Sequence, residues 1–107
     1  MKRGDLVVVA LQGDYGKPRP ALVVQSDLFD GHPSLTIAPV TSTIADAPLF
    51  RVTIEPTAAN GLRAVSQIMV DKLTTVRRDR VAQIGSLTDE ALLRVNRALV
   101  LWLGIAS

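Results

Sequence analysis

Residues 88–104, TDEALLRVNRALVLWLG, carry the periodicity of an α-helix. Thr88 can cap the first turn, and the acidic residues at 89 and 90 suit the positive end of the helix dipole. Gly104 fits the position just after a helix. One apolar stripe repeats at helical spacing and consists of Leu92, Val95, Leu99 and Leu103. This stretch therefore predicts one amphipathic helix at the C-terminal end.

The residues before this helix have the pattern of short β-strands. Apolar, β-branched runs bounded by Gly, Pro and Asn predict strands at residues 6–11, 21–25, 35–40, 51–55, 64–70 and 81–84. Because proline cannot donate a backbone hydrogen bond, Pro39 must lie at an edge, a bulge or the end of its strand. Many short strands followed by one helix indicate an α+β fold, mainly β, with a small curved sheet or barrel against the helix.

The segments between the strands carry turn signals. Residues 14–20 contain three Gly or Pro residues and predict a loop. We expect a short helical turn at 26–29, a polar loop at 41–48 and a turn around Asn60-Gly61. The arginines at 77, 78 and 80 flank Asp79 and predict a solvated, charged loop.

Length and composition limit the classes of protein that fit. A chain of 107 residues predicts a single domain, 1–107, with one core. The absence of cysteine and the single histidine, His32, exclude a zinc ribbon, a thiol nucleophile, a histidine metal site and a two-histidine nuclease. No apolar stretch approaches the ~20 residues that span a bilayer, and the N-terminal residues lack a signal-peptide pattern, so we expect a cytoplasmic protein.

The charge balance is mildly basic. Twelve basic residues against ten acidic ones give +2, and nine of the twelve are arginine, which binds phosphate through two parallel hydrogen bonds. The four aromatic residues are too few for a platform on which bases stack.

Five segments, in order along the chain, resemble the MazF/PemK family of toxins from bacterial type II toxin–antitoxin modules. They are residues 2–7 (KRGDLV), 19–27 (RPALVVQSD), 38–43 (APVTST), 61–62 leading to 70–71 and 73–76 (GL, VD, LTTV), and 84–90 (IGSLTDE). The resemblance implies an SH3-like β-barrel with a C-terminal helix. It also implies a homodimeric, sequence-specific endoribonuclease that needs no metal or cofactor, cuts single-stranded RNA and is inhibited by a cognate antitoxin.

Arg19 matches the essential arginine of that family. It lies between two prolines, where the backbone is stiff, and a fixed guanidinium can stabilise charge that builds on a phosphate. The alternative is a surface arginine paired with Asp14. Lys17 is close in sequence and is predicted to bind RNA.

Thr41 matches the catalytic threonine of the family. It is the first of three consecutive hydroxyl residues at the end of a predicted strand, and hydroxyls there can donate to phosphate oxygens. Ser42 is predicted to contact RNA. The alternative is an ordinary turn rich in hydroxyl groups.

Asp71 matches a residue to which one branch of the family assigns the general base. A carboxylate can accept the proton of a ribose 2′-hydroxyl, but Asp71 could instead pair with Lys72 or cap the next turn. Lys72 is itself predicted to bind RNA. Met69 and Thr74 depart from the family pattern, so the preferred RNA sequence cannot be carried over.

Two rival functions come from other classes. A CcdB-type toxin shares this fold and poisons gyrase through apolar residues at its C-terminal end, and residues 102–105 (WLGI) suit that function. A non-catalytic RNA-binding barrel is the second rival. Neither rival requires the matches at Arg19 and Thr41.

Overall fold

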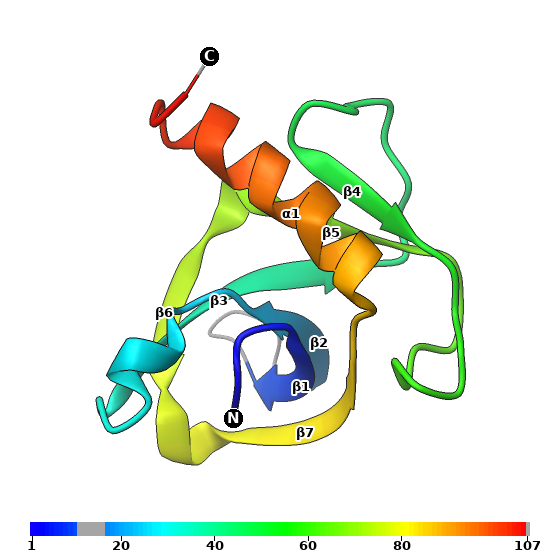
Figure 1. Ribbon diagram of the computed structural model, residues 1–107. Helices are drawn as coiled ribbons and strands as arrows, with labels where there is room; N and C mark the ends of the chain where they lie inside the picture. Colours follow the sequence, from blue (N-terminus) through cyan, green and yellow to red (C-terminus); the bar gives the residue numbers. More distant parts are fainter. Residues whose placement is uncertain (11–16, 107) are drawn as a thin grey trace.

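The computed structural model describes residues 1–10 and 17–106, which form one curved antiparallel sheet and a C-terminal helix (Figure 1). The strands are β1 (Asp5–Ala10), β2 (Pro18–Val23), β3 (Ser34–Thr41), β4 (Arg51–Ile54), β5 (Ser66–Met69), β6 (Thr74–Arg77) and β7 (Val81–Ser86). The helices are α1 (Asp89–Trp102) and three 3-10 turns, η1 (Asp27–Phe29), η2 (Val70–Lys72) and η3 (Arg78–Arg80). The predicted α+β class is confirmed. No helix in these ranges is long and apolar enough to cross a membrane.

Strand β3 lies at the centre of the sheet. The strand order is β4-β5-β3-β2-β1-β7, and β6 also pairs with β3. Residues 37–39 of β3 pair with β2, residues 34–37 with β6 and residues 40–41 with β5. The chain passes from β5 to β6 through η2, so this short turn connects the two strands that follow one another along β3.

Both faces of the central strands are buried, although the described chain has one α-helix. Alternate residues of β1 belong to different apolar clusters: Leu6 packs with α1, and Val7 packs with β2 and β3. A flat sheet with one helix would leave its second face in water. Here the sheet curves on itself and covers that face, as in a small barrel. In Figure 1 the strands curve around the first residues of the chain, and α1 lies across β4, with which it packs.

Helix α1 begins and ends as its sequence predicts, but its apolar stripe is shorter. The Thr88 hydroxyl accepts the backbone N–H of Ala91 at 3.2 Å, and Gly104 adopts a φ of +71° after the helix. Val95 and Leu99 are buried with the small residues 91 and 98. Leu103, expected on the stripe, is 54% exposed, because the helix ends at Trp102 and its final turn extends past the core.

Two predictions about the strands were wrong in detail. Residues 74–77 form β6, and 78–80 form η3, where the sequence predicted no strand and a charged loop. Pro39 lies inside β3, opposite Ala21. It stands between the last β3 residue paired with β6 and the first paired with β5, so its missing N–H interrupts neither pairing.

The turn at residues 57–61 packs directly on β7. Asn60 is 4% exposed, and its side-chain oxygen accepts the backbone N–H groups of Thr57 and Leu62, each at 3.0 Å. The backbone of this turn approaches Gly85 so closely that a Cβ there would lie 2.4 Å from the Asn60 carbonyl carbon. Only glycine fits this contact.

We expect Gly85→Ala to lower the free energy of unfolding by about 3 kcal/mol, because the added methyl group meets backbone that cannot rotate away. Urea denaturation measures the change. The matched control is Gly31→Ala, where an added Cβ meets no atom within 4 Å, and its expected effect is below about 0.5 kcal/mol. Equal stability of the two variants would contradict the close packing of this turn on β7.

Candidate nucleic-acid interface

Arg19 and Thr41 lie at the same end of neighbouring strands. In the β2–β3 pair, Ala21 is opposite Pro39, and the register runs without a shift through residues 23 and 37. Arg19 lies two residues before Ala21, opposite Val9 of β1, and Thr41 lies two residues after Pro39, opposite Gln67 of β5. Because β2 and β3 are antiparallel, the start of β2 and the end of β3 bring the two residues to the same end of the sheet. Arg19 is exposed and Thr41 is partly buried.

The Thr41 side chain is held in one orientation by its own turn. Its Oγ1 accepts the backbone N–H of Thr43 at 3.1 Å. A hydroxyl that accepts from the backbone retains its own hydrogen for donation. The predicted turn of hydroxyl groups is therefore present, and it leaves the Thr41 O–H able to donate to an anion. Ser42 is exposed beside it.

Asp71 forms an ion pair that the sequence did not indicate. Its Oδ1 accepts from Nε of Arg51 at 2.9 Å, and its Oδ2 accepts from Nη2 of the same side chain at 3.3 Å. The two side chains are only 16% and 14% exposed. The partner of Asp71 is thus an arginine 20 positions earlier and not the adjacent Lys72. No local sequence motif predicts this ion pair, because β4 and η2 come together only in the folded sheet.

The two predicted RNA-binding lysines are exposed. Lys17 directly precedes β2, and Lys72 is the last residue of η2. The backbone around Lys72 is fixed, because its carbonyl oxygen accepts the hydroxyl of Thr74 at 2.8 Å. Asp14, the alternative partner of Arg19, lies outside the described residues.

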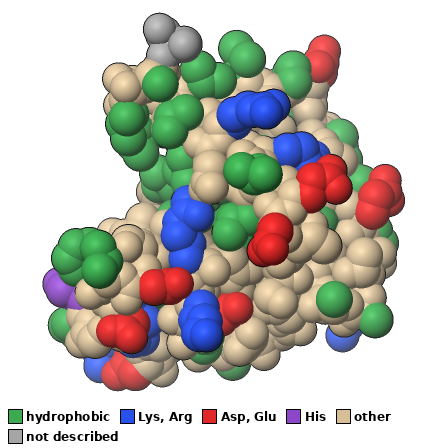
Figure 2. Space-filling view, viewed as in Figure 1, with side chains coloured by type: hydrophobic (Ala, Val, Ile, Leu, Met, Phe, Trp, Pro, Cys, Tyr) green, Lys and Arg blue, Asp and Glu red, His purple; other side chains and the backbone are tan. Residues whose placement is uncertain are grey.

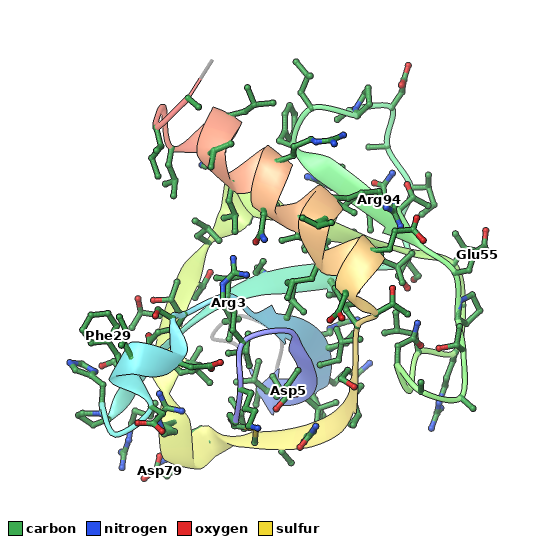
Figure 3. All side chains as sticks on the ribbon, viewed as in Figure 1. Arg3, Asp5, Phe29, Glu55, Asp79 and Arg94 are labelled. Atoms are coloured by element: carbon green, nitrogen blue, oxygen red, sulfur yellow. The ribbon has the colours of Figure 1, made fainter. Side chains whose placement is uncertain are left out.

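A groove of about 700 Å³ lies between the 44–49 loop, β4 and α1. Its loop wall is fixed by Gln67, which is 3% exposed and makes two hydrogen bonds, of 2.9 and 3.0 Å, to the backbone of Ala45. Gln67, which lines the groove, is also the β5 residue opposite Thr41. Arg94 and Arg97 line it from the helix. Figure 3 shows Arg94 reaching from α1 towards β4, where it donates to the Thr53 carbonyl at 3.1 Å.

Apolar side chains gather over the C-terminal end of α1, and basic side chains lie beside them (Figure 2). The exposed apolar residues at this end are Leu101, Trp102, Leu103 and Ile105. The Trp102 ring lies against Phe50, with a centroid distance of 5.6 Å, and remains 49% exposed. Together these four residues expose more apolar surface than is usual for a small domain, which is typical of a contact site.

Known proteins that resemble this chain belong to one toxin family. The family described as PemK-like, MazF-like toxin of type II toxin–antitoxin system matches residues 2–103. The chain is 48% identical over 108 residues to a protein of Mycolicibacterium smegmatis described as a probable endoribonuclease MazF, covering 99% of both chains.

Solved structures of similar fold include a MazE–MazF complex from Deinococcus radiodurans. That structure has 28% identity and a TM-score of 0.78, with 99% of this chain and 97% of that chain covered. A mycobacterial endoribonuclease in complex with its cognate antitoxin has 20% identity and a TM-score of 0.84, with 100% and 98% covered, and shows the shared fold.

Proposed function

Since this chain belongs to the PemK-like, MazF-like toxins of type II toxin–antitoxin systems, we propose that it is a metal-independent endoribonuclease that cuts single-stranded RNA in the cytoplasm. The observation that supports the proposal is that Arg19, in the first residues of β2, and Thr41, the last residue of β3, lie at the same end of two paired antiparallel strands. A cation and a hydroxyl donor at one end of a sheet suit a phosphate with developing negative charge.

The reaction that fits these groups is an internal phosphoryl transfer. The ribose 2′-oxygen attacks the adjacent phosphorus and loses its proton, the bond from phosphorus to the 5′-oxygen breaks, and that oxygen takes up a proton. The products are a 2′,3′-cyclic phosphate and a 5′-hydroxyl end. Because the substrate supplies a nucleophile already held beside the phosphorus, the reaction requires no metal-activated water.

Each site residue has a distinct role in this scheme. Arg19 stabilises the charge on the phosphate oxygens and relays a proton, and Thr41 orients the phosphate through its O–H. Lys17, Ser42 and Lys72 bind the RNA backbone. Asp71, the candidate general base, accepts a hydrogen bond from Arg51 on each of its two oxygens.

The proposed partner that keeps the enzyme inactive is a cognate antitoxin with an acidic, partly apolar segment. One solved structure that this chain resembles is a MazE–MazF complex from D. radiodurans. Acidic side chains can replace RNA phosphates at Lys17, Arg19 and Lys72, and apolar ones can pack on the rim of the sheet. Salt should weaken this complex less than it weakens RNA binding, because apolar burial is not screened.

One set of parallel incubations tests the function. Purified protein is mixed with a long RNA, with the same RNA plus EDTA, and with gyrase and supercoiled DNA. We expect RNA cleavage that EDTA does not change and no effect on gyrase. Gyrase inhibition without RNA cleavage would identify the CcdB-type toxin, and RNA binding without cleavage would identify a non-catalytic barrel.

We also propose that the chain acts as a homodimer, with Leu101, Trp102 and Ile105 in or beside the contact. These side chains are 43%, 49% and 73% exposed, and their burial against a second copy would remove apolar surface from water. We expect the mass of a dimer by light scattering at micromolar concentration. Trp102→Asp should shift the protein towards monomer, whereas Leu93→Asp, a change at another exposed leucine of α1, should not. A monomeric wild-type protein would contradict this proposal.

A further inference from the structure

The Arg51–Asp71 pair differs in kind from an ordinary surface ion pair. Two guanidinium nitrogens donate to the two carboxylate oxygens, and both side chains are about 15% exposed. The other ion pair described in residues 1–10 and 17–106, Arg77–Asp79, is 69% and 64% exposed. A bidentate ion pair that is mostly buried restrains the backbone around it more strongly than an exposed pair does, because water competes less for its hydrogen bonds.

Arg51 is well placed to act as an anchor, because its own backbone is fixed. It is the first residue of β4, it is opposite Met69 of β5, and its N–H donates to the Ala47 carbonyl at 2.9 Å. One residue earlier, the Phe50 carbonyl accepts the N–H of Val70 at 3.1 Å. The start of β4 therefore holds η2 twice, once through its backbone and once through the Asp71 carboxylate.

Each residue of η2, the turn that carries Lys72, is held by burial or by a hydrogen bond. Val70 is fully buried, Asp71 is bound by Arg51, and the Lys72 carbonyl accepts the Thr74 hydroxyl. The turn connects β5 and β6, which both pair with β3, and β3 ends in Thr41. A cation on such a rigid support loses little conformational freedom when it binds a phosphate.

We propose that Arg51 is a positioning residue for RNA binding. Through Asp71 it holds the η2 turn, and with it Lys72, in the geometry that binds the RNA backbone, and Asp71 is its structural partner and not the general base. The inference rests on the proposed function, since RNA is the ligand assigned to Lys72.

The two roles of Asp71 predict different kinetics. A general base acts in the transition state, so its loss lowers kcat by about 100-fold or more and removes a limb of the pH–rate profile. A positioning partner of Lys72 acts on substrate binding, so its loss raises KM while kcat and its pH dependence stay the same.

The test measures kcat and KM for cleavage of an RNA oligonucleotide, together with the Tm of each variant. The main variant is Arg51→Gln/Asp71→Asn, which removes both charges and so leaves no buried charge without a partner. We expect its KM to rise about tenfold, with kcat within about twofold of the wild-type value. Asp71→Asn should also raise KM, and the pH dependence of its kcat should match that of the wild-type protein. The matched control, Arg77→Gln/Asp79→Asn, makes the same chemical change in the exposed pair and should leave KM unchanged.

A second comparison tests whether the effect passes through Lys72. Lys72→Gln alone should raise KM, and adding it to the Arg51→Gln/Asp71→Asn variant should raise KM by no more than about twofold further, because both changes remove one contact. Independent, multiplicative effects would overturn the inference. So would a loss of kcat with its pH limb in Asp71→Asn, or a fall in Tm and active fraction at unchanged KM. Failure of the proposed function is distinct, since the wild-type protein would then cleave no RNA.

Discussion

Arg19→Ala is expected to lower the rate of RNA cleavage at saturating substrate by about 100-fold or more, which is the usual cost of removing a donor aimed at developing oxyanion charge. The residue is exposed at the start of β2, so the substitution removes little packing, and the protein should keep its circular dichroism spectrum and its Tm. Single-turnover cleavage of a labelled RNA measures the rate directly.

The matched control for this prediction is Arg63→Ala, which removes another exposed arginine that is not among the predicted site residues. Its cleavage rate should equal that of the wild-type protein. If Arg19→Ala still cleaved RNA or arrested growth at matched expression, Arg19 would have no part in the mechanism, and the alignment of β2 with β3 would serve only the fold.

Removal of the substrate's own nucleophile should have an even larger effect. An oligonucleotide with a single 2′-deoxyribose at the cleaved position should not be cut at all, because the attacking oxygen is absent. Its binding should be nearly unchanged, because phosphate contacts by Arg19 and Lys72 do not involve the 2′-hydroxyl. Gel analysis measures cleavage, and fluorescence anisotropy measures the Kd of the same molecule.

The unmodified RNA is the control, and its product ends must carry a 2′,3′-cyclic phosphate and a 5′-hydroxyl. Cleavage of the deoxy-substituted strand, or a product with a 3′-hydroxyl end, would show that water attacks the phosphorus. The groups on β2 and β3 would then need a different role.

The sequence by itself determined the features that depend on neighbouring residues. Thr88 and Gly104 mark the two ends of α1, and Ser26 begins η1 by accepting the N–H of Leu28 at 3.2 Å. The turn at Asn60-Gly61 is also local, and Gly61 has the φ of +72° that favours glycine. Each signal acts within a few residues, so the order of the sequence is enough to reveal it.

The predicted roles of Arg19 and Thr41 come from the resemblance to a known family. Their residue types and turns are visible in the sequence, but their position at the same end of the sheet is not. That position follows from the antiparallel pairing of β2 with β3, whose register is set by burial of alternate residues on two curved faces. The catalytic roles of both residues remain predictions for the experiments above.

Only the tertiary structure decided the parts that depend on distant residues. Strand β6 has mostly polar residues, and it is a strand because β3 offers it an unpaired edge. Leu103 follows the helical spacing yet is exposed, because the core ends before it. Asp71 pairs with Arg51 across 20 positions, because η2 and the start of β4 meet at a corner of the sheet. Short-range signals fix where elements begin and end, whereas the partner of a charged side chain depends on which surfaces the folded chain brings together.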